Sequence, residues 1–186
     1  CSATDPETLR DDLLGFGEEL QYARPSMAPI HNLVERWMDR VGALATTEPE
    51  RLRHEAAAIA QLLSDESVHA VAAAAHEAAQ LIGPGGTIIT HSLSSTVLEA
   101  FRELAGPGVS AITPESRPGL EGRNLARYLD REGVPVRFIT DAQVGHFCAR
   151  ADVALVGADT LLGDGALVNK AGSYLLALAA RDRGIP

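Results

Sequence analysis

The chain has 186 residues, of which 46% are hydrophobic, and its formal net charge is −9. This hydrophobic content is enough for a buried core and excludes a disordered chain, while the negative charge argues against direct binding of nucleic acid, which requires clustered lysines and arginines. With only Cys1 and Cys148, and with short apolar runs, the sequence offers no disulfide framework, metal-binding spacing or membrane span, so we expect a cytoplasmic protein without cofactor, metal or membrane partner.

The first half of the sequence predicts helices. Apolar residues from Met27 to Val41 recur at helical spacing, which gives a helix with one buried face. A second, alanine-rich helical region runs from about residue 48 to residue 82, with a break expected near residues 64–67. Gly83-Pro84-Gly85-Gly86 then ends it. We therefore expect a helical N-terminal part over residues 1–84.

From residue 85 onward, short β-branched runs alternate with amphipathic helices, a pattern typical of successive βα units and a parallel sheet. The fold class is therefore α/β, with a second domain over residues 85–186. Gly184-Ile185-Pro186 repeats the pattern of Gly133-Val134-Pro135, which precedes a strand, so we expect either that at least one strand of the natural fold is missing from this sequence or that a partner closes the domain. The predicted strands are 87–91, 109–114, 134–141 and 153–159, and the predicted helices are 95–104, 120–132, 142–149 and 170–183.

Several hydroxyl groups follow the first predicted strand. Ligands of open parallel sheets bind beyond the carboxyl ends of the strands. There, His91 is followed by Ser92, Ser94, Ser95 and Thr96 at the start of a predicted helix, where free N–H groups favour an anion. The alternative is that Ser95 or Thr96 only caps the helix, with Glu99 completing a capping box. Capping needs one hydroxyl and this stretch offers four, so a ligand role remains open beside it.

Two aspartates close predicted strands. Asp159 follows the apolar run 153–158, where a carboxylate at the rim of the sheet can act as an acid or a base. Asp141 has the same position on its own strand. For both residues, the alternative is a carboxylate that caps the following turn.

Three cationic side chains are candidate phosphate ligands. Lys170 stands at the start of the last predicted helix, where a cation is unfavourable unless an anion offsets it. Its neighbour Asn169 could be only an N-cap. Arg24 and Arg117 each precede a proline and a helix, and a guanidinium group can bind phosphate oxygens in bidentate fashion.

At these residues the sequence resembles the translation initiation factor 2B alpha/beta/delta-related family and its relatives ribose-1,5-bisphosphate isomerase and methylthioribose-1-phosphate isomerase. The resemblance implies a helical N-terminal part, a Rossmann-like C-terminal part, and homodimers or higher assemblies. It also implies that Arg24, Arg117, Asn169 and Lys170 contact phosphate or sugar, and that Asp159 matches the catalytic aspartate. The matching stretches are Arg24-Pro25-Ser26, Thr90-His91-Ser92 with Ser94-Ser95, Glu115-Ser116-Arg117-Pro118 with Gly122, Asp141, and Gly157-Ala158-Asp159 with Asn169-Lys170 and Gly172.

Two departures from the isomerase pattern are relevant. The isomerases have a catalytic cysteine directly after the Thr-His pair, where this chain has Ser92, and serine is a far poorer proton donor or acceptor near neutral pH. They also carry an Arg-Gly-Ala phosphate loop upstream of the Arg-Pro motif, which the residues before Arg24 do not match.

Three hypotheses follow from these residues. The first is a regulatory or weakly catalytic member of the family that binds a phosphorylated sugar or nucleotide, which Ser92 favours. The second is an aldose-ketose isomerase of a ribose 1-phosphate derivative, which Asp159, Asn169 and Lys170 favour. In it, Asp159 moves the proton and Ser92 or a water replaces the thiol. The third is an interaction scaffold whose rim binds nothing.

Overall fold

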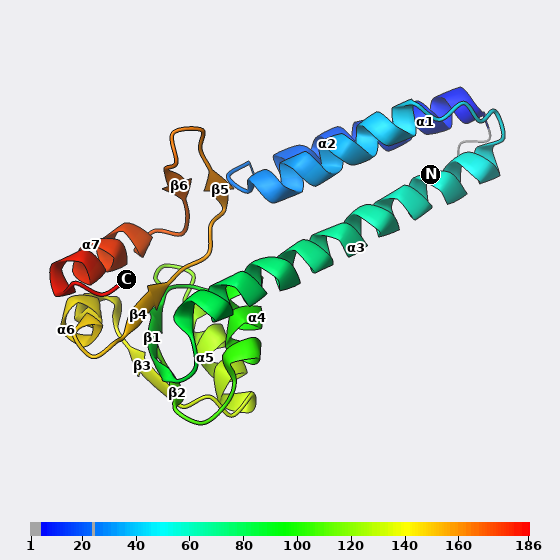
Figure 1. Ribbon diagram of the computed structural model, residues 1–186. Helices are drawn as coiled ribbons and strands as arrows, with labels where there is room; N and C mark the ends of the chain where they lie inside the picture. Colours follow the sequence, from blue (N-terminus) through cyan, green and yellow to red (C-terminus); the bar gives the residue numbers. More distant parts are fainter. Residues whose placement is uncertain (1–4, 24) are drawn as a thin grey trace. The chain divides into compact units, whose positions relative to one another are not determined.

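The computed structural model describes residues 5–23 and 25–186 (Figure 1). The chain forms two compact units. The first comprises Cys1–His69 with Asp159–Val168, and the second comprises Ala70–Ala158 with Asn169–Pro186. Arg24, one of the predicted phosphate ligands, lies outside the described residues.

The second unit, which is described throughout, is built on a parallel sheet. Its strands are β1 (Gly86–Thr90), β2 (Val109–Pro114), β3 (Val136–Ile139) and β4 (Val153–Leu155), in the order β3-β2-β1-β4. Ile88 of β1 lies between Ala111 and Val153 in the register. The predicted α/β class with a parallel sheet is confirmed. Because β2 and β4 flank β1 on opposite sides, the strand order reverses there, which makes this a topological switch point.

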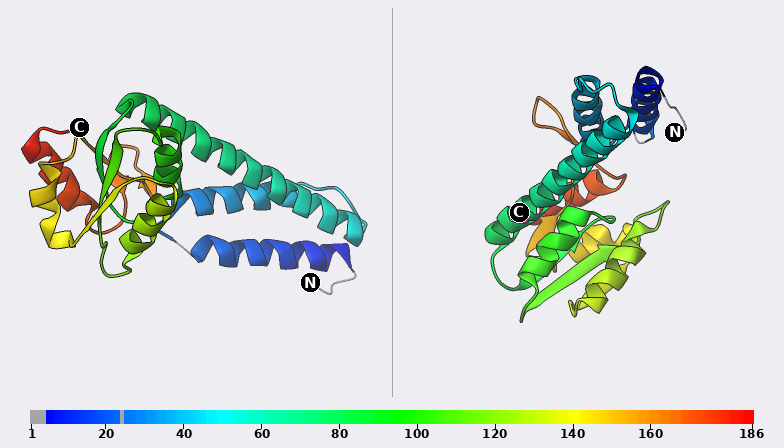
Figure 2. Two further views of the ribbon diagram at one scale, coloured as in Figure 1. Left: turned by 90° about the horizontal axis from the view of Figure 1, so that it is seen from below. Right: turned by 90° about the vertical axis from the view of Figure 1, so that its right-hand side faces the viewer.

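Helices cover both faces of this sheet (Figures 1 and 2). Neighbouring residues of a strand point to opposite faces, so Ile88 and Ile89 enter separate cores. Ile88 packs in a cluster with Phe101 of α4 (Ser95–Leu104) and Leu129 of α5 (Glu121–Arg131). Ile89 packs in a second cluster with residues of α6 (Val144–Cys148) and α7 (Ser173–Arg183). A short 3-10 helix, Asp141–Gln143, precedes α6. Among the described residues, no helix is both long and apolar enough to cross a membrane.

The first unit contains α1 (Pro6–Tyr22), α2 (Ala28–Gly42), the start of α3 (Pro49–Ile82) and a hairpin. The sequence analysis did not predict this hairpin, in which β5 (Thr160–Leu161) pairs antiparallel with β6 (Leu167–Val168). It binds the start of α2, because the Ala28 N–H donates to the Asp159 carbonyl at 3.1 Å. The Thr160 hydroxyl also donates to the Ser26 carbonyl at 3.0 Å.

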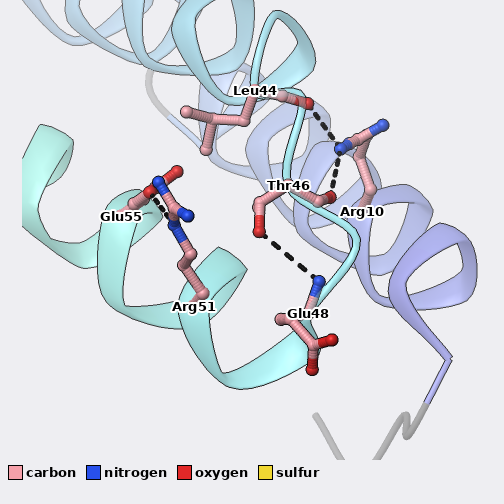
Figure 3. A network of polar contacts seen from close by, with 6 residues as sticks. All are labelled: Arg10, Leu44, Thr46, Glu48, Arg51 and Glu55. Atoms are coloured by element: carbon pink, nitrogen blue, oxygen red, sulfur yellow. Dashed lines mark hydrogen bonds and ion pairs between the residues drawn. The ribbon is translucent and has the colours of Figure 1, made fainter.

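An arginine of α1 holds the loop that joins α2 to α3 (Figure 3). Arg10 Nη2 donates to the carbonyl oxygens of Leu44 at 2.6 Å and Thr46 at 3.4 Å. The Thr46 hydroxyl in turn accepts from the Glu48 N–H at 3.4 Å, one residue before α3 begins. One guanidinium group therefore donates hydrogen bonds to two loop carbonyls that would otherwise bond to water.

The predicted break at residues 64–67 is wrong, since α3 runs without interruption from Pro49 to Ile82. Polar contacts keep this stretch helical: Glu66 forms an ion pair with Arg36 of α2 at 2.5 Å, and Gln61 donates to Asp65 at 2.8 Å. The other predicted elements of the second unit occur in the predicted order. However, β4 ends at Leu155 instead of residue 159, and α7 begins at Ser173 instead of residue 170.

Candidate ligand site at the sheet rim

The candidate site lies where β1 and β2 end. His91 and Ser92 directly follow β1, and both are buried, with 3% and 4% of their surfaces exposed. The loop 115–120 follows β2 and leads into α5. All of these residues belong to the second unit, as do Asn169 and Lys170.

His91 is fixed by the segment that precedes α7. Its Nε2 lies 2.7 Å from the carbonyl oxygen of Ala171. Gly172 is the N-cap of α7 and has a φ of 108°, a conformation that side chains rarely adopt. A Cβ at this glycine would also collide with the His91 ring. Glycine at position 172 therefore allows the backbone to lie against the imidazole.

Ser92 has a left-handed backbone, with a φ of 65°. Its N–H donates to the Ser116 hydroxyl at 2.8 Å, which links the loop after β1 to the loop after β2. Ser116 is itself fully buried and has a φ of 60°. Such conformations cost free energy in non-glycine residues and occur most often at functional sites.

Asp141 holds the loop after β2. Its two carboxylate oxygens accept from the N–H groups of Ser116 and Arg117, each at 2.8 Å. The carboxylate thus bonds a neighbouring loop instead of capping the turn that follows its own strand. Its role is to position Ser116, which in turn positions Ser92.

The helix after β1 is capped by Ser94 and not by Ser95 or Thr96. The Ser94 hydroxyl accepts from the Val97 N–H at 3.4 Å, and Ser95 is the first residue of α4. The alternative in which Ser95 or Thr96 caps the helix with Glu99 is therefore wrong. Gly157, in the loop after β4, packs against this cap, because a Cβ there would lie 2.7 Å from the Ser94 hydroxyl.

Lys170 is the single lysine of the chain. It lies before the N-cap of α7 and not in the helix, so the expected conflict with the helix dipole does not arise. Its Nζ donates to Glu121 Oε1 at 2.8 Å. This hydrogen bond, together with the backbone N–H of Glu121 itself, holds the pKa of the Glu121 carboxyl below its usual value. Asn169 Nδ2 donates to the Ser173 hydroxyl at 2.7 Å, so it is not the N-cap either.

Glu121 is a rim residue that the sequence analysis missed. It is the first residue of α5, where an acidic side chain is ordinarily explained by the helix dipole alone. The one sequence feature that indicated Glu121 as a rim residue was its position between Arg117-Pro118 and Gly122, which are part of the matching stretches.

Two further predicted site residues are Arg117, a phosphate ligand, and Asp159, the catalytic aspartate. The Arg117 side chain is 67% exposed and forms a long ion pair with Glu115, at 3.5 Å. Asp159 belongs to the first unit, where its N–H donates to the Val168 carbonyl at 2.8 Å. Within the described residues, no three His, Cys, Asp or Glu side chains are arranged to hold a metal ion.

A parallel sheet with a buried polar rim at its switch point defines an α/β protein of the open-sheet kind. The chain matches the Initiation factor 2 subunit family over residues 2–186 and belongs to that family, which confirms the resemblance seen in the sequence.

Named relatives include both factors and enzymes. The translation initiation factor eIF-2B subunit 2-like protein of Pyrococcus horikoshii is 41% identical over 98% of this chain and 63% of that protein. A ribose 1,5-bisphosphate isomerase of Haloferax volcanii is 31% identical over 99% of this chain and 57% of that protein.

The similar solved structures also include a factor and an enzyme. The crystal structure of the translation initiation factor eIF-2B of Pyrococcus horikoshii matches with a TM-score of 0.79 at 40% identity, over 98% of this chain and 63% of that one. The 5-methylthioribose 1-phosphate isomerase of the same organism matches with a TM-score of 0.82 at 25% identity, over all of this chain and 56% of that one. The chain spans less than two thirds of the length of each of these relatives.

Proposed function

We propose that the rim of the second unit binds a phosphorylated sugar or nucleotide, and that the protein is a regulatory or weakly catalytic member of its family. The observation that carries the proposal is the placement of Lys170. The only lysine of an acidic chain directly precedes Ala171, whose carbonyl oxygen lies 2.7 Å from Nε2 of the buried His91, and the N-cap of α4, Ser94, follows His91 in the same rim loop. A cation, free N–H groups and hydroxyls together suit an anionic, hydroxylated ligand.

The second candidate function is aldose-ketose isomerisation of a ribose 1-phosphate derivative, such as ribose 1,5-bisphosphate or methylthioribose 1-phosphate. The presence of isomerases among the named relatives favours it, as do Asp159, Asn169 and Lys170 in family order. In this reaction Asp159 would move a proton between C2 and C1, with Ser92 or a water in place of the thiol. Ser92 is the reason why binding without efficient turnover remains the first proposal.

Ligand binding is tested with Lys170→Ala, leaving Asn169 in place. Loss of charge-assisted hydrogen bonds to a phosphate should weaken the affinity for ribose 1,5-bisphosphate or a nucleoside monophosphate about tenfold or more. The measurement is the ligand-dependent rise in melting temperature, because a ligand that binds only the folded state stabilises it by mass action. Arg131→Ala, at the far end of α5, removes an equal charge and should leave the affinity unchanged.

The alternative for Lys170 is a purely structural ion pair with Glu121. If Lys170→Ala lowers the melting temperature but leaves the ligand affinity of the folded fraction unchanged, that alternative holds and the proposal loses its main support.

Homo-oligomerisation is part of the proposal. The resemblance implies it, and α7 exposes two adjacent apolar side chains, Tyr174 and Leu175, at 75% and 65%. Sedimentation at micromolar concentration should therefore give a symmetric dimer or a larger assembly. Tyr174→Glu with Leu175→Glu should shift it toward the monomer if α7 contributes to the interface. A single monomeric species for the unaltered protein would contradict the prediction.

A further inference from the structure

A polar pocket lies at the amino ends of β1, β2 and β3, away from the rim. It has a volume of about 350 Å³, and all of the residues that line it belong to the second unit. Its polar side chains are Thr87, Ser110, Arg137 and Arg150, and we call it the arginine pocket. Thr87 precedes Thr90, the last residue of β1, by a distance of about 10 Å along the extended strand, so the pocket is separate from the rim.

The polar side chains of the arginine pocket share one face of the sheet. Thr87, Ser110 and Arg137 each lie two residues before an isoleucine of the core cluster that packs with α6 and α7. Residues two apart in a strand point to the same face, so all three point to the face that these helices cover. Arg150 reaches the pocket from the turn after α6, where its N–H donates to the Phe147 carbonyl at 2.9 Å.

The ring of Phe147 gathers the two arginines. The Cζ atom of Arg137 lies 5.6 Å from the centroid of this ring, and that of Arg150 lies 5.0 Å from it. Both distances are within the range in which an aromatic ring attracts a guanidinium group. Two like charges at one ring also repel one another, and an anion bound beside them would offset this repulsion.

Neither arginine is neutralised by the protein. Among residues 5–23 and 25–186, no carboxylate forms an ion pair with Arg137 or Arg150. Arg150 Nη2 lies 3.5 Å from His146 Nε2, which carries no negative charge. The carboxylate of Asp152 instead accepts from the Thr87 N–H at 2.7 Å. In a chain with a net charge of −9, this pocket therefore keeps two positive charges available for a ligand.

The two hydroxyl groups of the pocket add a further donor. Thr87 Oγ1 and Ser110 Oγ lie 3.0 Å apart, so one of them donates to the other. Each hydroxyl has a single hydrogen, which leaves one of the two hydrogens free to donate to a ligand. The pocket thus offers two guanidinium groups and a hydroxyl, all of them donors, and it suits a ligand that carries several acceptor oxygens.

A phosphate monoester matches these donors better than a carboxylate does. It has three acceptor oxygens and nearly two negative charges at neutral pH, so it can accept from both guanidinium groups and the hydroxyl at once. We propose that the arginine pocket binds the phosphate group of a small molecule and is a second anion site of the protein. This inference does not depend on the function proposed for the rim, because the two sites share no residue. The alternative is that Phe147 only packs two solvated arginines.

Calorimetric titration with methyl phosphate tests the pocket. It is done on the Lys170→Ala protein at pH 8 and low salt, so that the rim site of the proposed function contributes least. Adding Arg137→Ala or Arg150→Ala should raise the dissociation constant about tenfold or more, since charge-assisted hydrogen bonds are lost. Both side chains are exposed, so the fold should tolerate these changes. Arg131→Ala removes an exposed arginine outside the pocket and should leave the dissociation constant unchanged.

Chemical modification locates the bound anion in the unaltered protein. Phenylglyoxal reacts with guanidinium groups, and mass spectrometry of the peptides gives the rate at each arginine. Saturating methyl phosphate should slow the modification of Arg137 and Arg150 several-fold and leave that of Arg131 unchanged. Acetate, at the same concentration, should protect them less, because a carboxylate has fewer acceptor oxygens and a smaller charge.

The outcomes decide between the pocket and its alternative. Weaker binding in both variants, with protection confined to Arg137 and Arg150, supports the proposal. It is overturned if methyl phosphate does not bind, if neither variant changes the dissociation constant, or if Arg131 is protected equally. Acetate that protects as well as methyl phosphate would overturn the assignment to phosphate. Failure of binding at the rim would leave all of these results unaffected.

Discussion

Gly122→Ala should destabilise the second unit by about 3 kcal/mol or more, at the upper end of the usual cost of overpacking. Gly122 lies in the first turn of α5, and a Cβ there would overlap the carbonyl oxygen of Pro114 at the end of β2. The obstacle is backbone, so no side-chain rotation can relieve it. The start of α5 must move away from the sheet, and Glu121 must move with it. Urea denaturation and the melting temperature measure the loss.

A second helical glycine serves as the control for this prediction. Gly145 of α6 has no neighbouring atom within 4 Å of its Cβ position. Gly145→Ala should therefore be neutral or stabilise the protein by up to about 1 kcal/mol, the difference in helix propensity. Equal stability changes for the two variants would refute the account of Gly122 as a close-packing glycine.

Ser92→Cys should raise isomerisation of ribose 1,5-bisphosphate or methylthioribose 1-phosphate if the rim is an isomerase site weakened by loss of the thiol. A positioned acid-base group contributes roughly 10²–10⁴-fold in rate, and a cysteine can have its pKa tuned toward neutrality. The backbone at position 92 is already fixed by its bond to Ser116, so the near-isosteric thiol should be placed without rearrangement. The assay follows conversion of the aldose to the ketose in the full protein.

The gain should depend on Asp159. Asp159→Asn in the Ser92→Cys background should abolish it, because an amide cannot exchange the proton. Ser67→Cys, on α3, adds the same thiol elsewhere and should give no gain. If Ser92→Cys binds the sugar phosphates without turnover, the catalytic reading fails and the binding protein remains. Turnover by the unaltered protein at ~1–10³ per second would instead show that Ser92 is compatible with catalysis.

The sheet could be predicted from the sequence because its signals are local. The strands β1, β2 and β3 contain β-branched residues, and the next element after each of them is a helix, so the alternation of strand and helix is visible in the residue spacing. The hairpin could not be predicted in this way. Its strands are two residues long, and the turn residues Gly163-Asp164-Gly165 between them resemble an ordinary loop. The bonds that define its place, between Thr160 and the start of α2, join residues far apart in the chain.

The sequence indicated where the candidate site residues lie, at the ends of the strands, but it did not indicate which of them bond one another. Strand ends and hydroxyl runs indicate a rim, but which polar groups satisfy one another depends on side-chain geometry that no spacing reveals. Asp141 was expected to be catalytic or capping, and instead bonds Ser116 and Arg117. Lys170 was expected to await an anion from outside, and Glu121 already provides one. The roles of the predicted site residues in ligand binding, and the domain division at residue 84, stay predictions.

The chain has one lysine, Lys170, and it allows selective cleavage of the backbone at the rim. Because every other basic side chain that bears a fixed charge is arginine, an endoproteinase that cuts only after lysine has one target in this sequence, the bond between Lys170 and Ala171. That bond lies where Glu121 holds the lysine side chain and His91 holds the following carbonyl. Its rate of cleavage therefore reports how firmly the protein holds this one bond of the rim, without any label.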